Sequence, residues 1–188
     1  MKGQTGFTLT EVLVVVTIVA ILLSIGVPSY KYITTSYRMS AELNSLVGDL
    51  MYARAEAIKE GQPVAICVST DGLTCSGGTT WQSGWVVFPD PAGNGSGDVP
   101  ASTLHVQGAF AGATPDSFVL TNPISSIIFN REGFAVGAPV AAGAAFAANQ
   151  FTLHDPTANA AYTRCLVISA QGMLQTETGQ VHPFSACN

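Results

Sequence analysis

The chain has 188 residues, of which 47% are hydrophobic and only 10% are charged. A soluble globular domain typically carries about 25% charged residues. This deficit predicts that part of the chain lies in lipid or in a protein–protein interface. The net charge of −5 excludes a general nucleic-acid-binding surface, because such a surface needs an excess of basic residues.

The first element is an apolar stretch from Phe7 to Val27, in which Glu11 is the single charged residue. As a helix it would be about 31 Å long, which matches the hydrocarbon thickness of a bilayer. A buried helix of a soluble protein normally keeps a polar stripe, and this stretch has none. A secretory signal peptide would carry its cleavage site after the apolar stretch. The candidate cleavage site here follows Gly6 and so comes before the apolar stretch.

The hexapeptide GFTLTE at residues 6–11, followed by this apolar run, resembles the type IV prepilin (class III signal) motif. The resemblance implies that a prepilin peptidase removes residues 1–6 by cutting between Gly6 and Phe7, and then methylates the new amine of Phe7. Pro28 falls where such pilins often carry a helix-bending proline, so we expect a bend at Gly26 and Pro28.

Glu11 is predicted to act in filament assembly. A lone carboxylate in a bilayer costs roughly 2.5–3.5 kcal/mol, so it persists only with a partner or a function. Cleavage creates a cationic amine at Phe7, one helical turn away. In a filament, Glu11 of one subunit would neutralise the Phe7 amine of the next subunit and thereby fix the axial register.

The helical pattern continues to about Glu60, and Gly61 followed by Pro63 is its stop signal. A 3.6-residue period places one apolar stripe on this outer half, which we expect to pack on the following domain. The stripe consists of Met39, Leu43, Leu46, Leu50, Ala53 and Ala57. The charged residues expected largely off the stripe are Glu42, Asp49, Glu56 and Lys59.

From Pro63 onward, short strand-like runs alternate with turn residues. The expected strands are Val64–Val68, Gly84–Phe88, Thr103–Gln107, Ser117–Leu120, Ser126–Asn130, Phe151–His154, Arg164–Ser169 and Met173–Gln175. We expect the Ala/Gly-rich segment from Val136 to Asn149 to be irregular.

The predicted fold class is α+β: a long N-terminal transmembrane helix packed on a C-terminal antiparallel β domain, the pilin fold. The expected divisions are leader 1–6, membrane helix 7–28, amphipathic helix 29–61 and β-rich head 62–188.

The four cysteines are Cys67, Cys75, Cys165 and Cys187, and none forms a CxxC pair. Their even number favours two disulfides and an oxidising compartment, with buried free thiols as the alternative. We prefer Cys67 with Cys75 and Cys165 with Cys187, because each pair closes a short loop. Each such disulfide would stabilise the fold by roughly 2–3 kcal/mol.

The orientation of the membrane helix is not decided by its flanking charges. Counting Lys2 against Lys31 and Arg38 does not favour a cytoplasmic N-terminus. The expected disulfides overrule this count, because they place the cysteines outside and the six-residue leader inside. With the prepilin resemblance, this implies a bacterial inner-membrane protein whose head lies in the periplasm.

The head resembles the GspH/FimT group of minor pilins and pseudopilins. The resemblance rests on Cys67 and Cys75 followed by WQSGWVVF at 81–88, on IIFNREG at 127–133, and on RCLVIS at 164–169 followed by Gly172. It implies a structural subunit that helps to initiate assembly of a type IV pilus or a type II secretion pseudopilus. The implied partners are other pilins, contacted through the N-terminal helices, together with the prepilin peptidase and the inner membrane.

A second function, DNA capture during natural transformation, is known for FimT-type pilins that end in a basic Gly-Arg-x-Arg motif. The corresponding residues here are Gly172-Met173-Leu174-Gln175, without arginine. Phosphate contacts need positive charge, so nucleic acid is not an expected partner.

A membrane-anchored enzyme is the third alternative. No Gly-x-Ser-x-Gly motif or zinc-ligand spacing is present, and we expect no catalytic residue, metal or cofactor.

Overall fold

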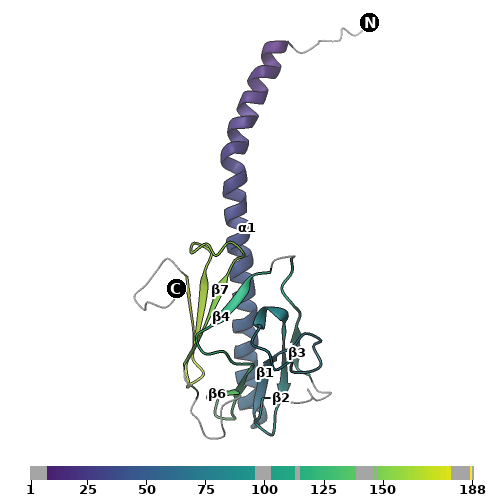
Figure 1. Cartoon of the computed structure of the whole chain (residues 1–188), viewed down its shortest axis with the longest axis vertical. Helices are drawn as coiled ribbons and strands as arrows, with labels where there is room; N and C mark the ends of the chain where they lie inside the picture. Colours follow the sequence, from purple (N-terminus) through teal and green to yellow (C-terminus); the bar gives the residue numbers. More distant parts are fainter. Residues whose placement is uncertain are drawn as a thin grey trace. The chain divides into compact units, whose positions relative to one another are not determined.

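The computed structural model describes residues 8–95, 103–112, 115–138, 146, 148–178 and 187. The chain divides into two compact units, residues 1–38 and residues 39–188. We refer to them as the N-terminal unit and the head, and each is described by itself. Helix α1 (Leu9–Glu60) contributes residues to both units, and the strands all belong to the head (Figure 1).

Within the head, helix α1 buries one apolar stripe, and the first buried residue along the helix is Met39. The stripe predicted from the 3.6-residue period is confirmed at every position. The buried apolar residues of the helix are Met39, Leu43, Leu46, Leu50, Ala53 and Ala57. The expectation for Asp49 was wrong, because this residue is buried beside the stripe. The helix ends before Gly61, whose φ of +66° places it in the left-handed conformation typical of a residue that follows a helix.

Two antiparallel sheets form the rest of the head. The first sheet, in the order β3-β2-β1-β5-β6, comprises β1 (Val64–Val68), β2 (Trp85–Pro89), β3 (His105–Gln107), β5 (Ser126–Phe129) and β6 (Ala135–Ala138). The second sheet, in the order β4-β7-β8-β9, comprises β4 (Ser117–Leu120), β7 (Asn149–His154), β8 (Arg164–Ile168) and β9 (Leu174–Thr178). A short 3-10 helix, η1 (Trp81–Ser83), precedes β2. The predicted α+β class is therefore confirmed.

Each strand expected from the sequence is present, with boundaries shifted by a few residues. Strand β6 is the correction, because Val136 begins the segment that we expected to be irregular. It forms a strand by pairing with β5, with Ile128 opposite Val136 and Phe129 opposite Ala135. Residues 139–145 of the same segment lie outside the described part of the chain.

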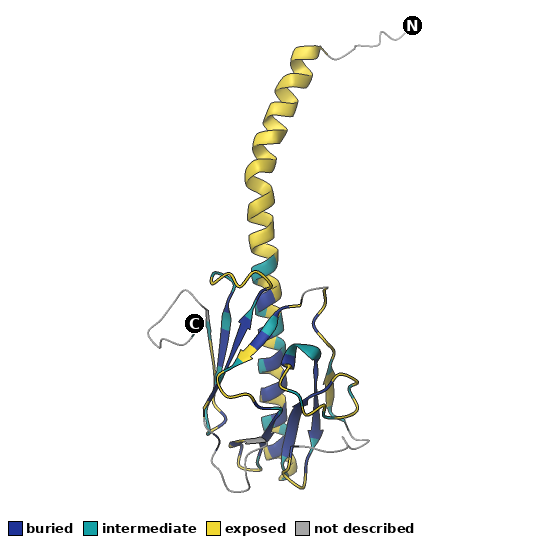
Figure 2. Ribbon diagram, viewed as in Figure 1, coloured by how far each residue is buried: buried dark blue, intermediate teal, exposed yellow. Residues whose placement is uncertain are grey.

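The main core lies between the helical stripe and the inner faces of both sheets, and Figure 2 colours the buried segments of the ribbon dark blue. Aromatic rings fill its centre. Trp81 meets Phe151 edge-on with ring centroids 5.3 Å apart, and Trp85 meets Phe110 edge-on at 5.9 Å. A smaller apolar cluster covers the opposite face of the first sheet. Strand β1 is therefore buried on both faces, which explains its uninterrupted apolar sequence.

The two sheets meet at their turns. The backbone N–H of Ala135 donates to the carbonyl of Ala170, 3.0 Å away, and so links the start of β6 to the turn after β8. Arg54 of helix α1 donates from Nε to the Gly133 carbonyl at 3.0 Å and from its guanidinium to the Gln171 carbonyl at 3.2 Å. One helical side chain thus joins a turn of each sheet.

Candidate functional site

The N-terminal unit presents an exposed apolar helical surface. Every residue of helix α1 from Leu9 to Val27 is exposed, as the yellow segment in Figure 2 shows. By length and composition the helix can cross a membrane, and its most apolar stretch of 18 residues contains no buried residue. Leaving so many valine, leucine and isoleucine side chains in water would forfeit the free energy of apolar burial. This surface therefore needs lipid or other helices around it.

The carboxylate of Glu11 is held at the start of this helix by Thr8. The Thr8 backbone N–H and the Thr8 hydroxyl each donate to Glu11 Oε2 at 2.9 Å. In return, the Glu11 backbone N–H lies 3.3 Å from Thr8 Oγ1. This reciprocal arrangement is a capping box, which satisfies backbone donors that the first helical turn leaves unpaired. The Thr-x-x-Glu spacing signals it in the sequence, but our sequence analysis assigned Glu11 to assembly alone.

The remaining N-terminal site predictions have different outcomes. Gly6 and Phe7 lie outside the described residues, so cleavage and methylation there stay predictions. Gly26 and Pro28 both lie inside helix α1, which continues through the proline. The bend expected at these two residues also stays a prediction.

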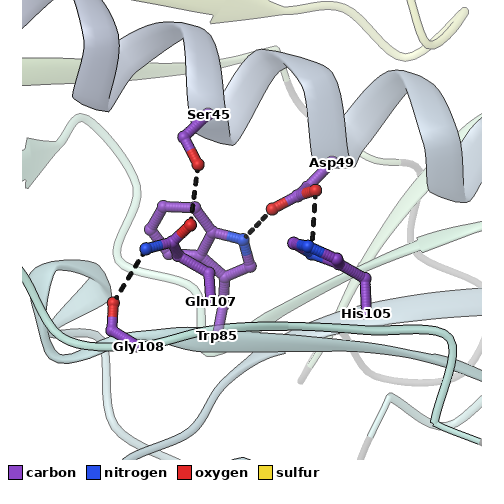
Figure 3. Close-up of polar contacts among 6 residues, drawn as sticks. All are labelled: Ser45, Asp49, Trp85, His105, Gln107 and Gly108. Carbon is purple, nitrogen blue, oxygen red and sulfur yellow. Dashed lines mark hydrogen bonds and ion pairs between the residues drawn. The ribbon is translucent and has the colours of Figure 1, made fainter.

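In the head, a group of polar side chains ties helix α1 to strands β2 and β3 (Figure 3). Asp49 Oδ2 accepts a hydrogen bond from Trp85 Nε1 at 2.7 Å, and Asp49 Oδ1 lies 3.0 Å from His105 Nδ1. One turn earlier on the helix, the Ser45 hydroxyl donates to Gln107 Oε1 at 2.8 Å. These contacts fix the edge strand β3 against the helix. Their role is structural, because the Asp49 carboxylate is buried and both of its oxygens already have partners.

Two disulfides close loops of the head. Cys67 is bonded to Cys75, with Cα atoms 5.6 Å apart, and Cys165 is bonded to Cys187, with Cα atoms 5.8 Å apart. This connectivity is the one that the short-loop argument prefers. Inside the first loop, Asp71 accepts hydrogen bonds from the backbone N–H groups of Leu73 and Thr74, each 2.8 Å away.

The basic residues of the head are few, and each already has an oxygen partner. Arg54 donates to two turn carbonyls, and Lys59 lies 2.9 Å from Glu56. Arg131 lies 2.8 Å from Glu132, and Arg164 donates to the backbone carbonyls of residues 161 and 163. No unpaired cluster of positive charge forms among them. Both tryptophans are fully buried, so neither offers a face on which a base can stack.

The described residues contain no group of three or more His, Cys, Asp or Glu side chains that could hold a metal ion. His105 is engaged with Asp49, and His182 lies outside the described residues. Asp90 begins a turn-rich loop and accepts a hydrogen bond from the Gly95 backbone N–H at 2.7 Å. Its carboxylate therefore organises the turn.

Comparison with known proteins agrees with this geometry. The profile of the family described as "Type II transport protein GspH" matches residues 42–172, and that of the "Prokaryotic N-terminal methylation motif" matches residues 1–27. Two fimbrial proteins of Pseudomonas aeruginosa are each 38% identical to the chain over 64 residues, which is 34% of this chain. The chain spans 41% of the length of these curated relatives.

Solved structures share the fold. The type IV minor pilin FimU of Pseudomonas aeruginosa gives a TM-score of 0.53 at 22% identity, covering 80% of this chain and 98% of FimU. The minor pseudopilin EpsH of the Vibrio cholerae type 2 secretion system gives 0.50 at 12% identity, covering 77% of this chain and 99% of EpsH.

The exposed apolar helix and the methylation motif indicate a membrane-anchored pilin whose head combines a helix with two antiparallel sheets. Because the GspH profile covers most of the chain, the protein belongs to the GspH family of minor pilins and pseudopilins, which are structural subunits.

Proposed function

We propose that this protein is a minor subunit that enters a type IV pilus or a type II secretion pseudopilus and helps to initiate its assembly. The observation that carries the proposal is Glu11, a capped carboxylate on an exposed apolar helix whose sequence matches the methylation motif. Family members assemble with other pilins, and the exposed helix supplies the surface for such contacts.

The proposed maturation begins with the prepilin peptidase, which cuts between Gly6 and Phe7 and methylates the Phe7 amine. This leaves Thr8 as an internal residue, so its backbone N–H and hydroxyl remain available to cap Glu11. Mature membrane-resident protein is then expected to start at a methylated phenylalanine. Mass spectrometry of the N-terminal peptide tests this step, and an intact Met1 would refute it.

The proposed topology is a single span of the bacterial inner membrane, with the head in the periplasm before assembly. Residues 7–28 form the span, residues 29–61 continue the helix, and residues 62–188 complete the head. Two disulfides in the head support an oxidising compartment on that side of the membrane.

In the proposed filament, Glu11 of one subunit pairs with the Phe7 amine of its neighbour. Inside an apolar helix bundle an unpaired carboxylate is strongly unfavourable, so the pairing would select one axial register. The capping box does not neutralise the carboxylate, because it supplies two hydrogen bonds from Thr8 and both reach the same oxygen, Glu11 Oε2. Glu11 can therefore keep its cap and still meet a cation.

The test must separate pairing from capping, because Glu11 does both. Glutamine also completes a capping box, so Glu11→Gln keeps the cap and removes the charge. Thr8→Val weakens the cap and keeps the charge, since it removes the two bonds between the hydroxyl and Glu11 and leaves the bond from the Thr8 backbone N–H. We expect Glu11→Gln to lower incorporation into sheared filaments about tenfold, equivalent to about 1.4 kcal/mol. Thr8→Val should incorporate nearly normally.

Incorporation is measured by immunoblot of the filament fraction, normalised to the amount of protein in the membrane. Filament assembly by Glu11→Gln at the wild-type level would refute the pairing. The role in initiation is tested separately, by counting filaments in a strain that lacks the protein. An unchanged number of filaments of normal length would refute that role.

A further inference from the structure

Three of the chain's five tyrosines lie between positions 30 and 37, directly after the apolar stretch. Tyr30 is 70% exposed and Tyr37 is 74% exposed, and Tyr32 is also exposed. Lys31 stands among them and is exposed as well. Most phenylalanines of the described head are buried in contrast, so large exposed rings concentrate in this one segment of the N-terminal unit.

Helical geometry places these side chains at a defined height. From Leu9 to Val27 the helix rises about 28 Å, close to the hydrocarbon thickness of about 30 Å. Tyr30 therefore begins about 4–5 Å beyond the apolar stretch, and Tyr37 about 10 Å further, two turns along the same face. Side chains of a helix lean toward its N-terminus, which brings both rings back toward the apolar stretch.

The residue types match the chemistry of this height. A tyrosine has an apolar ring and a hydroxyl, so it is favoured at the boundary between hydrocarbon and headgroups, where phenylalanine would leave no polar end in water. The lysine stem can lie along the apolar layer while its ammonium group reaches a lipid phosphate. A polar linker in water would gain nothing from exposing these rings.

We propose that Tyr30, Lys31, Tyr32 and Tyr37 form a tyrosine collar that binds the lipid headgroup layer on the side of the head. The collar rests on the proposed membrane anchoring and adds the position of the boundary. It sets how deeply the unassembled subunit sits, with Tyr30 and Tyr32 in the headgroup layer and Tyr37 at its outer edge. The hydrocarbon core then ends close to Val27.

The test uses the full chain in vesicles of phosphatidylcholine and phosphatidylglycerol, in which part of the phosphatidylcholine carries bromine on its acyl chains. Bromine quenches only tryptophan that lies beside it. The native Trp81 and Trp85 are fully buried in the head, so wild-type protein gives the unquenched baseline. Single substitutions Leu22→Trp, Tyr30→Trp and Met51→Trp then report three positions on helix α1, all exposed in the structure.

The collar predicts a different result at each position. Bromine near the chain ends should quench Leu22→Trp most strongly, and bromine near the headgroup should quench Tyr30→Trp most strongly. Met51→Trp should give the baseline with both lipids. Quenching of Leu22→Trp without quenching of Tyr30→Trp would overturn the collar and leave anchoring intact, so that the tyrosines would be assigned to contacts between subunits. No quenching of Leu22→Trp would overturn both proposals. Quenching of Met51→Trp would also overturn both, because it would show that the helix lies along the surface.

Discussion

Asp49 accepts a hydrogen bond from the indole Nε1 of Trp85 at 2.7 Å, and both side chains are buried in the head. The second oxygen of the same carboxylate lies 3.0 Å from His105 Nδ1. Helix α1, strand β2 and strand β3 thus converge on one acidic group. A buried carboxylate is strongly unfavourable without donors, so these two partners are what allow an acid on the inner side of the helix.

Replacing Asp49 should destabilise the head. In Asp49→Ala the Trp85 indole N–H stays buried without an acceptor, which costs about 1–3 kcal/mol. Asp49→Asn keeps an acceptor oxygen and should lose less. Urea unfolding of the detergent-solubilised chain, followed by tryptophan fluorescence, measures both losses. Asn44→Ala, at an exposed position of the same helix, is the control. A loss at Asp49→Ala no larger than in this control would contradict the prediction.

Arg54 should be required as an arginine. Its Nε and its terminal nitrogen donate to carbonyls in two turns that belong to different sheets. Lysine offers one compact ammonium group in place of a planar fork, so Arg54→Lys cannot reproduce both bonds. We expect a loss of about 1–3 kcal/mol in the free energy of unfolding. Hydrogen exchange should rise at both turns together, and a rise at only one turn would show that the arginine does not couple the sheets.

The sequence predicted the elements whose residues carry a repeated pattern. The 3.6-residue stripe from Met39 to Ala57 is strong enough to identify the helix and its buried face. Strands β1 and β5 are likewise marked by dense branched apolar residues. Strand β6 was missed because Ala135–Ala138 has no such pattern. Its strand conformation comes from hairpin pairing with the neighbouring strand β5 and from the bond to Ala170, which is distant in sequence.

The candidate site was predictable only where its signal is local. The motif around Gly6, Phe7 and Glu11 is read directly from consecutive residues. Asp49 was expected off the buried stripe, because the apolar spacing of the helix does not include it. Its partners, Trp85 and His105, come from strands that only the tertiary fold brings to the helix. A pattern confined to the helix could not reveal them.

Gly84 should tolerate no side chain. Its φ is +107°, and an added Cβ would lie 2.6 Å from the Gln107 carbonyl oxygen and 3.0 Å from that of Ser69. Both neighbours are backbone atoms, one in strand β3 and one directly after strand β1, so neither can move away as a flexible side chain would. Gly84→Ala should therefore destabilise by more than the roughly 1 kcal/mol typical of a point mutation.

Gly48 is the matched control for Gly84. It lies inside helix α1, and an added Cβ would meet nothing within 4 Å. Alanine is favoured over glycine in a helix interior by roughly 0.5–1 kcal/mol. Thermal unfolding of the two variants should therefore shift in opposite directions, downward for Gly84→Ala and upward for Gly48→Ala. Shifts of the same sign would show that the close approach at Gly84 can relax.

Asp71 should make the disulfide loop between Cys67 and Cys75 sensitive to acid. The backbone N–H of Leu73, then that of Thr74, hold the pKa of the Asp71 carboxyl well below its usual range. The unfolded chain binds its proton near the ordinary aspartate value of about 3.9. Because the folded pKa is the lower one, the stabilising contribution is complete above about pH 4 and is lost as the pH falls toward the folded pKa.

The variant Asp71→Asn tests this directly, because it removes the charge and keeps the shape of the side chain. Its melting temperature should be below that of wild type at neutral pH, and the difference should shrink as the pH falls below about 4. Thr74→Val removes only the hydroxyl that donates to Asp71 Oδ2 at 2.8 Å, so it should show a smaller deficit with the same pH dependence. A deficit that stays constant from neutral to acidic pH would mean that the loop depends on the shape of Asp71 and not on its charge.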